Sequence, residues 1–177
     1  MYKLREITKE DMKEINKWRN DPELIACLGA PYRYINEEVD YNWFDQYMRS
    51  RNNAVRCAIV DEQEQNIILG MISLLDINYV NRSGQLHIMI GRKENRGKGM
   101  GMFAVKEMLQ HAFNNLNLHR IELTALENNK VAIYIYEKCG FTIEGKKRES
   151  NYKNGKYLNT IIMSILENEW KRTNEEK

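Results

Sequence analysis

The sequence has little of what builds a disulfide-stapled, metal-centred or membrane-embedded protein. It holds three cysteines and three histidines among 177 residues, and none of the six stands at a spacing typical of a disulfide framework or a zinc site. Its uncharged apolar runs fall far short of the roughly 20 residues that cross a bilayer, and its first residues lack the apolar core of a signal peptide. We therefore expect no bound metal, no membrane partner and a cytoplasmic location.

A charge excess of one sign is also missing. The chain has 27 Lys and Arg against 25 Asp and Glu, a formal charge of +2, which disfavours a nucleic-acid partner. Only two prolines occur, and no repeat or linker interrupts the chain. The length and the 42% hydrophobic content predict a single domain over 1–177 with a real core, and residues 168–177 are expected to form a flexible polar tail.

Hydrophobic periodicity predicts strands that first cluster and then alternate with helices. Strands are expected at 2–7, 54–60, 67–79, 84–91, 121–125 and on both sides of the hairpin signal Asn154-Gly155. Helices are expected at about 8–20, with Thr8 as N-cap, and at about 36–50, 99–113 and 129–138. The order predicts an α/β (α+β) fold with a mixed, mostly antiparallel sheet of about seven strands and about four helices.

A glycine-rich loop, Arg96-Gly97-Lys98-Gly99-Met100-Gly101, stands between a predicted strand and a predicted helix. The backbone N–H groups at a helix start can cradle a phosphate, and glycines let that backbone approach closely. A Walker A loop does not fit, because Gly99 takes the place of the hydroxyl that binds magnesium, and a dinucleotide fingerprint does not fit, because its third glycine comes one place early. Taken alone, the loop is equally compatible with a simple turn.

The loop does fit the [R/Q]-x-x-G-x-[G/A] motif of the GNAT superfamily of acetyltransferases, with Arg96, Gly99 and Gly101 at the three fixed places. Further segments, in matching order and spacing, resemble the branch with ribosomal-protein, spermidine and amino-sugar acetyltransferases: 90–91, 116–123, 129–141 and 144–145. This resemblance implies a GNAT-type sheet whose two central strands splay around the pantetheine arm of acetyl-CoA. It also implies direct transfer of the acetyl group, without an acyl-enzyme intermediate.

The resemblance extends to the residues that bind the donor. It implies backbone contacts to pantetheine from Met89, Ile90 and Gly91, and pyrophosphate contacts from the loop, which comprises Arg96, Gly97, Lys98, Gly99, Met100, Gly101 and Met102. It makes Tyr136 the general acid toward the CoA sulfur and Asn129 a hydrogen-bond partner of the pantetheine. Seven residues span close to two helical turns, so these two side chains are expected on one helix face. Without the motif, Tyr136 would be interpreted as a half-buried core residue.

The acceptor site is the least defined by the sequence. Gln85 stands where many relatives carry a glutamate, and a glutamine cannot act as a base, so deprotonation of the amine falls to solvent, to His87, to Asp76 or to a carboxylate of the second helix. Glu38 and Trp43 belong to a segment of acidic and aromatic residues that could attract and hold a cationic amine. The same segment equally fits a solvated helix that packs on the core.

We expect an acetyl-CoA-dependent N-acetyltransferase that acts on the primary amine of a small molecule, a polyamine or an amino sugar. Residues 18–23 resemble amino-sugar and ribosomal-protein members, whereas 76–83 are closer to spermidine acetyltransferases, so the two hints disagree. Acetylation of a protein amino terminus and a catalytically silent acetyl-CoA-binding protein stay open as alternatives. A homodimer is compatible with the sequence, which does not reveal the oligomeric state.

Overall fold

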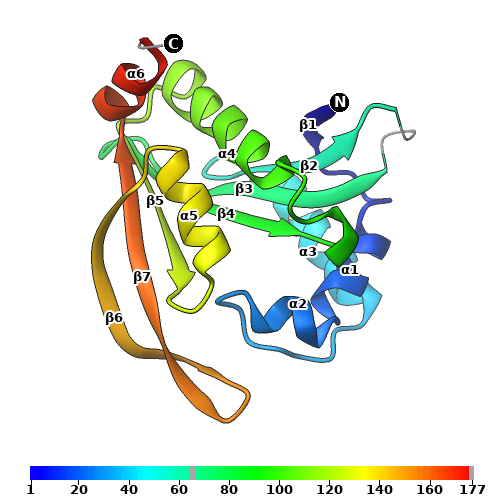
Figure 1. Cartoon of the computed structure of the whole chain (residues 1–177). Helices are drawn as coiled ribbons and strands as arrows, with labels where there is room; N and C mark the ends of the chain where they lie inside the picture. The colour runs from blue at the N-terminus through cyan, green and yellow to red at the C-terminus, as the bar shows by residue number, and fades with distance from the viewer. Residues whose placement is uncertain (64–66, 176–177) are drawn as a thin grey trace.

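The structure, a computed structural model, describes residues 1–63 and 67–175 and consists of a seven-stranded sheet with helices on both faces (Figure 1). The strands are β1 (Tyr2–Glu6), β2 (Val55–Asp61), β3 (Ile68–Asn78), β4 (Ser83–Ile90), β5 (Arg120–Leu126), β6 (Thr142–Lys153) and β7 (Lys156–Leu166). The helices are α1 (Met12–Arg19), α2 (Pro22–Ala26), α3 (Glu37–Arg49), α4 (Met100–Gln110), α5 (Lys130–Lys138) and α6 (Glu167–Glu175), with a short 3-10 turn at Lys93–Asn95 and a π turn at His111–Asn115.

The strands lie in the order β1-β2-β3-β4-β5-β7-β6. Every neighbouring pair is antiparallel except β4 and β5, which α4 connects as the predicted strand, helix, strand crossover. The β6–β7 hairpin turns at Asn154-Gly155, as expected, with φ of +48° and +80° at the two positions. The predicted fold class, a mixed and mostly antiparallel sheet of about seven strands, is confirmed.

Each face of the sheet carries its own apolar cluster. One cluster packs α4 and α5 against β3, β4, β5 and β7, with Met108 at its centre; we call this side the α4–α5 face. The other packs α1 and α3 against β2 and the ends of β3 and β4, with Ile15 at its centre; we call this side the α1–α3 face. Because side chains alternate along a strand, Ile88 of β4 contacts the first cluster and Met89 the second.

The amino-terminal helices differ from the expected single helix at 8–20. Thr8 is not the N-cap; Asp11 holds that position, and its carboxylate accepts from the Thr8 N–H at 2.8 Å and from Arg5 at 2.7 Å instead of capping its own helix. Asp21 does not only end α1. It caps the short helix α2 by accepting from two backbone N–H groups, and Pro22 at the first helical position suits a helix start.

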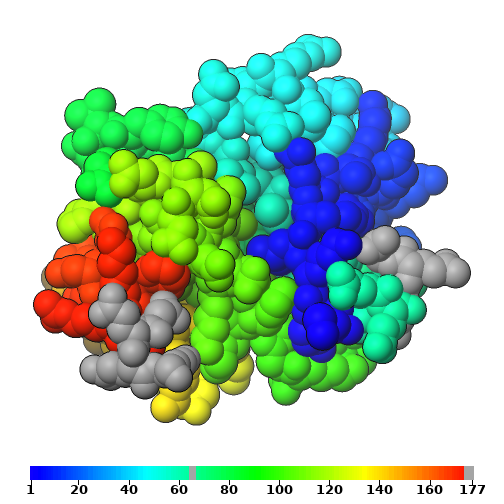
Figure 2. Space-filling view, turned by 90° about the horizontal axis from the view of Figure 1, so that it is seen from above, coloured from blue at the N-terminus to red at the C-terminus, as the bar shows by residue number. Residues whose placement is uncertain are grey.

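The expected flexible tail over 168–177 is corrected by α6, which occupies Glu167–Glu175. Trp170 packs against Phe113 with ring centroids 5.3 Å apart, and Figure 2 shows the red C-terminal segment against the turn that follows α4. The segment is polar apart from this tryptophan, so its sequence shows no helical stripe. With α2 and α6, the described residues form six α-helices rather than about four. Residues 176–177 lie outside the described residues.

The first helix docks onto the end of β4 through a contact that only glycine allows. Trp18 is 4% exposed and lies directly on Gly91, where an added Cβ would come within 2.1 Å of Cε2 of the indole. This contact fixes the distance between α1 and the strand that leads into the glycine-rich loop.

We predict that Gly91→Ala lowers the free energy of unfolding by about 1–3 kcal/mol, because the new methyl group forces the indole out of its position. Urea unfolding followed by circular dichroism measures this. Gly145→Ala is the matched control, since nothing lies within 4 Å of a Cβ there. Equal losses in the two variants would contradict the close-contact explanation.

Candidate active site

The two parallel strands at the centre of the sheet separate soon after they begin. β4 and β5 are paired only at Ser83↔Arg120, Gly84↔Ile121 and Gln85↔Glu122, after which each continues along its other neighbour. The splay that the family resemblance implied is thus present. A cleft of about 730 Å³ opens at this point, a size typical of small-molecule sites.

Both halves of the sheet, helix α5 and the segment before α3 line this cleft. Its lining residues are Arg19, Ile25, 27–31, Arg33, Ile35, Arg56, Met71, Ser73, Leu75, 86–89, 124–126, Asn129, Ala132, Tyr136, Asn151 and Thr160.

The backbone of β4 offers hydrogen-bonding groups to the cleft at alternate residues. The Gly91 N–H donates to the Leu69 carbonyl at 3.0 Å, so Gly91 and, by alternation, Met89 direct their backbone groups toward β3. Ile88 and Ile90 therefore direct theirs toward the gap that β5 leaves. Of the three residues expected to bind pantetheine through their backbone, Ile90 has this orientation. Ile88, which the sequence analysis missed, shares it, and strand alternation is the signal that finds it.

The glycine-rich loop forms the start of α4. Gly97 and Gly99 have φ of +75° and +80°, a region that favours glycine, and Gly99 is the N-cap residue. The Phe103 N–H donates to the Gly99 carbonyl at 3.0 Å, which leaves the N–H groups of the preceding residues without acceptors inside the helix. Such groups, at the positive end of the helix dipole, suit a pyrophosphate.

Individual loop residues differ in what they can contribute. Arg96 donates to the Gly91 carbonyl at 3.2 Å and so ties the loop to the end of β4. Lys98 is exposed, whereas Met100 is 2% exposed, so its side chain belongs to the core and only its backbone faces outward. A methyl group at Gly101 would meet only Ile135, at 3.7 Å, which agrees with the alanine that the family motif permits there.

Asn129 and Tyr136 both line the cleft from α5, as their spacing predicted. Asn129 is the N-cap of α5: its Oδ1 accepts from the Ala132 N–H at 3.2 Å, and its Nδ2 donates to the Cys27 carbonyl at 3.0 Å. Tyr136 is 8% exposed, and its ring packs against Phe141. Burial, and then the neighbouring Cys139 thiol, raise the pKa of Tyr136 to about 12, so the phenol keeps its proton at neutral pH.

The residues suggested for the acceptor separate into three groups. His87 lines the cleft. Trp43 and Asp76 line a smaller neighbouring pocket of about 300 Å³. Glu38 and Gln85 line neither, within the part of the chain that the structure describes.

Two residues of the α1–α3 face that the sequence analysis did not single out join His87 in the cleft, Arg56 of β2 and Ser73 of β3. The signal in the sequence is an arginine near the start of the strand Val55–Asp61, whose other residues as far as Val60 are apolar. Although much of His87 is exposed, desolvation of its ring, and then the Arg56 cation, lower the pKa of His87 below the usual histidine range, while Asp76 acts in the opposite direction.

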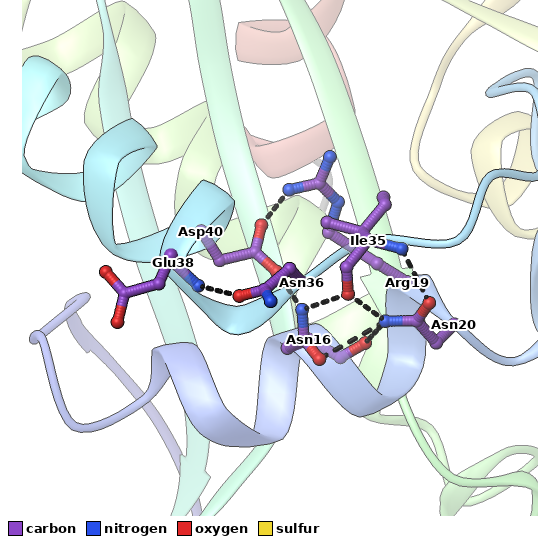
Figure 3. A network of polar contacts seen from close by, with 7 residues as sticks. All are labelled: Asn16, Arg19, Asn20, Ile35, Asn36, Glu38 and Asp40. Atoms are coloured by element: carbon purple, nitrogen blue, oxygen red, sulfur yellow. Dashed lines mark hydrogen bonds and ion pairs between the residues drawn. The ribbon is translucent and has the colours of Figure 1, made fainter.

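Residues 27–35, which we call the lip, cover one end of the cleft. Figure 3 shows how they are fixed: the Ile35 carbonyl accepts from Asn16 at 3.0 Å and from Asn20 at 2.8 Å, and the Ile35 N–H donates to Asn20 at 2.9 Å. Asn16 and Arg19 also donate to Asp40 of α3, which is fully buried. α1 and α3 thus hold one end of the lip between them.

The other end of the lip is held by the C-terminal half of the chain. Lys153 of the β6–β7 hairpin donates to the carbonyls of Ile25 and Ala30, and Asn129 donates to that of Cys27. Two elements that follow β5 therefore fix the lip across the mouth of the cleft.

Two further features bear on the chemistry. Within residues 1–63 and 67–175, no group of histidine, cysteine and carboxylate side chains is arranged to hold a metal ion. None of the helices described there has the length and apolar character needed to span a membrane.

Comparison with known proteins identifies the family. The model of the acetyltransferase (GNAT) domain matches residues 2–142. A spermidine N(1)-acetyltransferase of Vibrio cholerae is 32% identical, over 97% of this chain and 96% of that protein. The acetyltransferase PseH of Campylobacter jejuni is 25% identical, over 84% of this chain and 90% of that protein.

Solved structures show the same relationship. The crystal structure of spermidine N-acetyltransferase from Vibrio cholerae in complex with CoA and spermine superposes with a TM-score of 0.88 at 28% identity, and the match covers 96% of this chain and 97% of that one. The separated strands, the helix start at Gly99 and the buried phenol of Tyr136 accord with this match. The chain belongs to the GNAT family and is an acetyl-CoA-dependent N-acetyltransferase.

Proposed function

We propose that this enzyme transfers the acetyl group directly to the primary amine of a small molecule, a polyamine or an amino sugar. The observation that carries the proposal is the cleft between β4 and β5, which has Tyr136 on its α4–α5 side and His87 on its α1–α3 side. A thioester held between the strands would meet a proton donor on one side and an amine on the other.

In this proposal, backbone groups bind the donor. The groups of Ile88 and Ile90 that face the gap pair with the pantetheine amides, and Asn129 adds a side-chain contact. The N–H groups from Gly97 to Met102 hold the pyrophosphate. Acetyl-CoA supplies a carbonyl carbon that is activated by its thioester link.

The transfer forms a bond between the amine nitrogen and the acetyl carbon and breaks the bond between that carbon and sulfur. The amine loses one proton and the departing sulfur gains one. Tyr136, with its pKa of about 12, is protonated at neutral pH and can donate its hydrogen as negative charge develops on the sulfur.

His87 is the group we assign to receive the proton of the amine. Its lowered pKa keeps the imidazole neutral, and therefore able to accept a proton, at neutral pH. Gln85 cannot serve, because a carboxamide is not a base, and Asp76 borders the neighbouring pocket instead of the cleft.

A small acceptor suits this cleft better than a protein amino terminus. The lip is tied at Ile35 to α1, at Ala30 to Lys153 and at Cys27 to Asn129, so an extended polypeptide would have to displace three sets of hydrogen bonds. Two relatives that match 97% and 95% of this chain are named spermidine N(1)-acetyltransferases, and another that matches 95% is named a putative ribosomal N-acetyltransferase. Polyamines are therefore one of the two classes to test first, with amino-terminal peptides in the same panel.

The test is incubation of the purified protein with acetyl-CoA and a panel of spermidine, nucleotide-linked amino sugars and amino-terminal peptides, with release of free thiol followed. We expect release with a small amine and none with peptides. Because Cys27 is exposed, a reaction without amine sets the background. Binding of CoA without release for any amine would support a silent binding protein instead.

We predict that Tyr136→Phe lowers kcat by about 10²-fold or more, the range for loss of a general acid, while the dissociation constant of CoA changes little. Steady-state kinetics and calorimetry measure the two effects. Tyr134→Phe is the matched control, since Tyr134 is 56% exposed on the same helix and does not line the cleft. A similar loss of kcat in both variants would contradict the role of Tyr136 as general acid.

The assignment of His87 predicts a pH-dependent difference. A group with a lowered pKa is neutral above that pKa, so the wild type should lose activity as pH falls through a value below about 6.5. The acceptor's own titration is common to both enzymes. The ratio of wild-type activity to His87→Gln activity should therefore decrease as the pH is lowered from about 8 to about 5. A constant ratio would exclude His87 as the base.

A further inference from the structure

Three polar side chains stand side by side on the α1–α3 face and line the cleft: Arg56 of β2, Ser73 of β3 and His87 of β4. The strand register pairs Arg56 with Ser73 and Ser73 with His87. Directly paired residues of neighbouring strands share a face and lie within reach of one another. We call these three residues the Arg56 row.

Two members of the row each have a buried polar atom without a hydrogen-bond partner among the described residues. Ser73 is 1% exposed, and its Oγ has no hydrogen-bond partner among the described residues. The Nε of Arg56 is likewise buried and unpaired within residues 1–63 and 67–175. A buried polar group without a partner is destabilising by about 1–3 kcal/mol, and native proteins usually match such groups with a ligand or water. Two such groups on neighbouring strands indicate a surface that binds a polar ligand.

The charge around the cleft is positive. Arg19, Arg33 and Arg56 line it, and no carboxylate does so in the described part of the chain. The charge of Arg19 is matched by Asp40, and Arg33 is exposed on the lip. Arg56 forms no ion pair with any described residue.

The surroundings of Arg56 hold its guanidinium without neutralising it. The group lies 4.6 Å from the ring centre of Trp43 and 5.5 Å from that of Tyr47, both on α3. Burial lowers the pKa of Arg56, while Tyr47 and then Asp76 of β3 act in the opposite direction. Arg56 borders both the cleft and the smaller pocket that contains Asp76, and it forms no ion pair with that carboxylate. The unpaired cation is therefore present at the edge of the cleft.

We propose that the acceptor of this enzyme carries an oxyanion, a carboxylate or a phosphate, in addition to its amine, and that Arg56 and Ser73 bind this oxyanion. A guanidinium binds such groups through two parallel hydrogen bonds, and the Ser73 hydroxyl can add a third. The inference rests on the proposed function and narrows its acceptor to an anionic amine. His87, next in the row, then faces the reacting nitrogen.

The row is not explained by the phosphates of the donor. The N–H groups that suit the pyrophosphate open α4, which covers the α4–α5 face, whereas the row lies on the opposite face. A polyamine carries only positive charges, so it offers no partner for Arg56 and would be repelled by it. An amino sugar that carries a phosphate, or an amine that carries a carboxylate, offers an oxyanion to Arg56 and Ser73 and an amine to His87.

Matched pairs of acceptors test this proposal and distinguish a phosphate from a carboxylate as the oxyanion. Glucosamine 6-phosphate and glucosamine differ only in the phosphate; ornithine and putrescine differ only in the carboxylate. We expect kcat/KM to favour the anionic member of at least one pair by about tenfold or more, and to favour it over spermidine. The pair that shows the preference identifies the oxyanion.

Variants connect the preference to the row. Arg56→Gln should reduce by about tenfold the ratio of kcat/KM between the anionic member of a pair and the member without the oxyanion, both measured in the same variant. Arg56→Lys keeps the charge but loses the planar guanidinium, so its preference for the anionic member should lie between that of the wild type and that of Arg56→Gln. Ser73→Ala leaves the stacking on α3 intact and should also weaken the preference, so the test holds even if Arg56→Gln folds poorly.

Calorimetry distinguishes failure of this inference from failure of the proposed function. Binding of the anionic member in the presence of CoA that disappears in Arg56→Gln supports the row, even where no acetyl group is transferred. Transfer that prefers spermidine or the members without the oxyanion, or that falls equally for both members of a pair in Arg56→Gln, overturns the inference and leaves the acetyltransferase function standing.

Discussion

The structure depends on the point where β4 and β5 stop pairing. Past Gln85 and Glu122, the two strands keep only their outer neighbours, and the backbone groups of Ile88 and Ile90 have no strand to pair with on their inner side. Backbone groups in a protein interior need partners, so the sheet is complete only when an extended, amide-containing molecule lies in the gap. The pantetheine arm is such a molecule, and the helix start at Gly99 provides for the phosphates attached to it.

Local signals in the sequence predicted where Asn129 and Tyr136 lie and how the glycine-rich loop turns. The register of Asn129 and Tyr136 depends only on helical period, and the turns at Gly97 and Gly99 depend only on backbone conformation. Which residues of β4 face the gap could not be read from a motif. The answer requires knowing which strand lies on each side of β4. The pairing with β3 directs the backbone groups of Ile88 and Ile90 toward the gap, and those of Met89 and Gly91 toward β3. Helix α6 escaped prediction for a similar reason, because a single tryptophan fixes it by a tertiary contact.

Of the proposed acceptor site, the sequence indicated only His87, because the site is assembled across strands. Arg56, Ser73 and His87 are far apart in the chain and meet only through the register of β2, β3 and β4. Asp76 is the opposite case, a residue that the sequence suggested for the acceptor site and that lies outside the cleft. The pairing of β3 with β4 shifts between Leu75 and Asn78, and Asp76 has φ of +50° at that irregularity, so it borders the smaller pocket. No alternation rule anticipates such a shift.

The two sides of the cleft therefore obey different constraints. In the proposed function, donor binding relies on backbone geometry, which side-chain substitutions hardly alter. The proposed acceptor binding relies on side chains of three strands and on a lip held by Asn20 and Lys153. The uncharged residue at Ser73 leaves the charge of Arg56 without a counter-ion among the described residues that line the cleft. A carboxylate at Ser73 would neutralise the charge of Arg56 and remove its repulsion of a cationic amine. Small changes on one face of the sheet can thus redirect the acceptor while the donor site stays as it is.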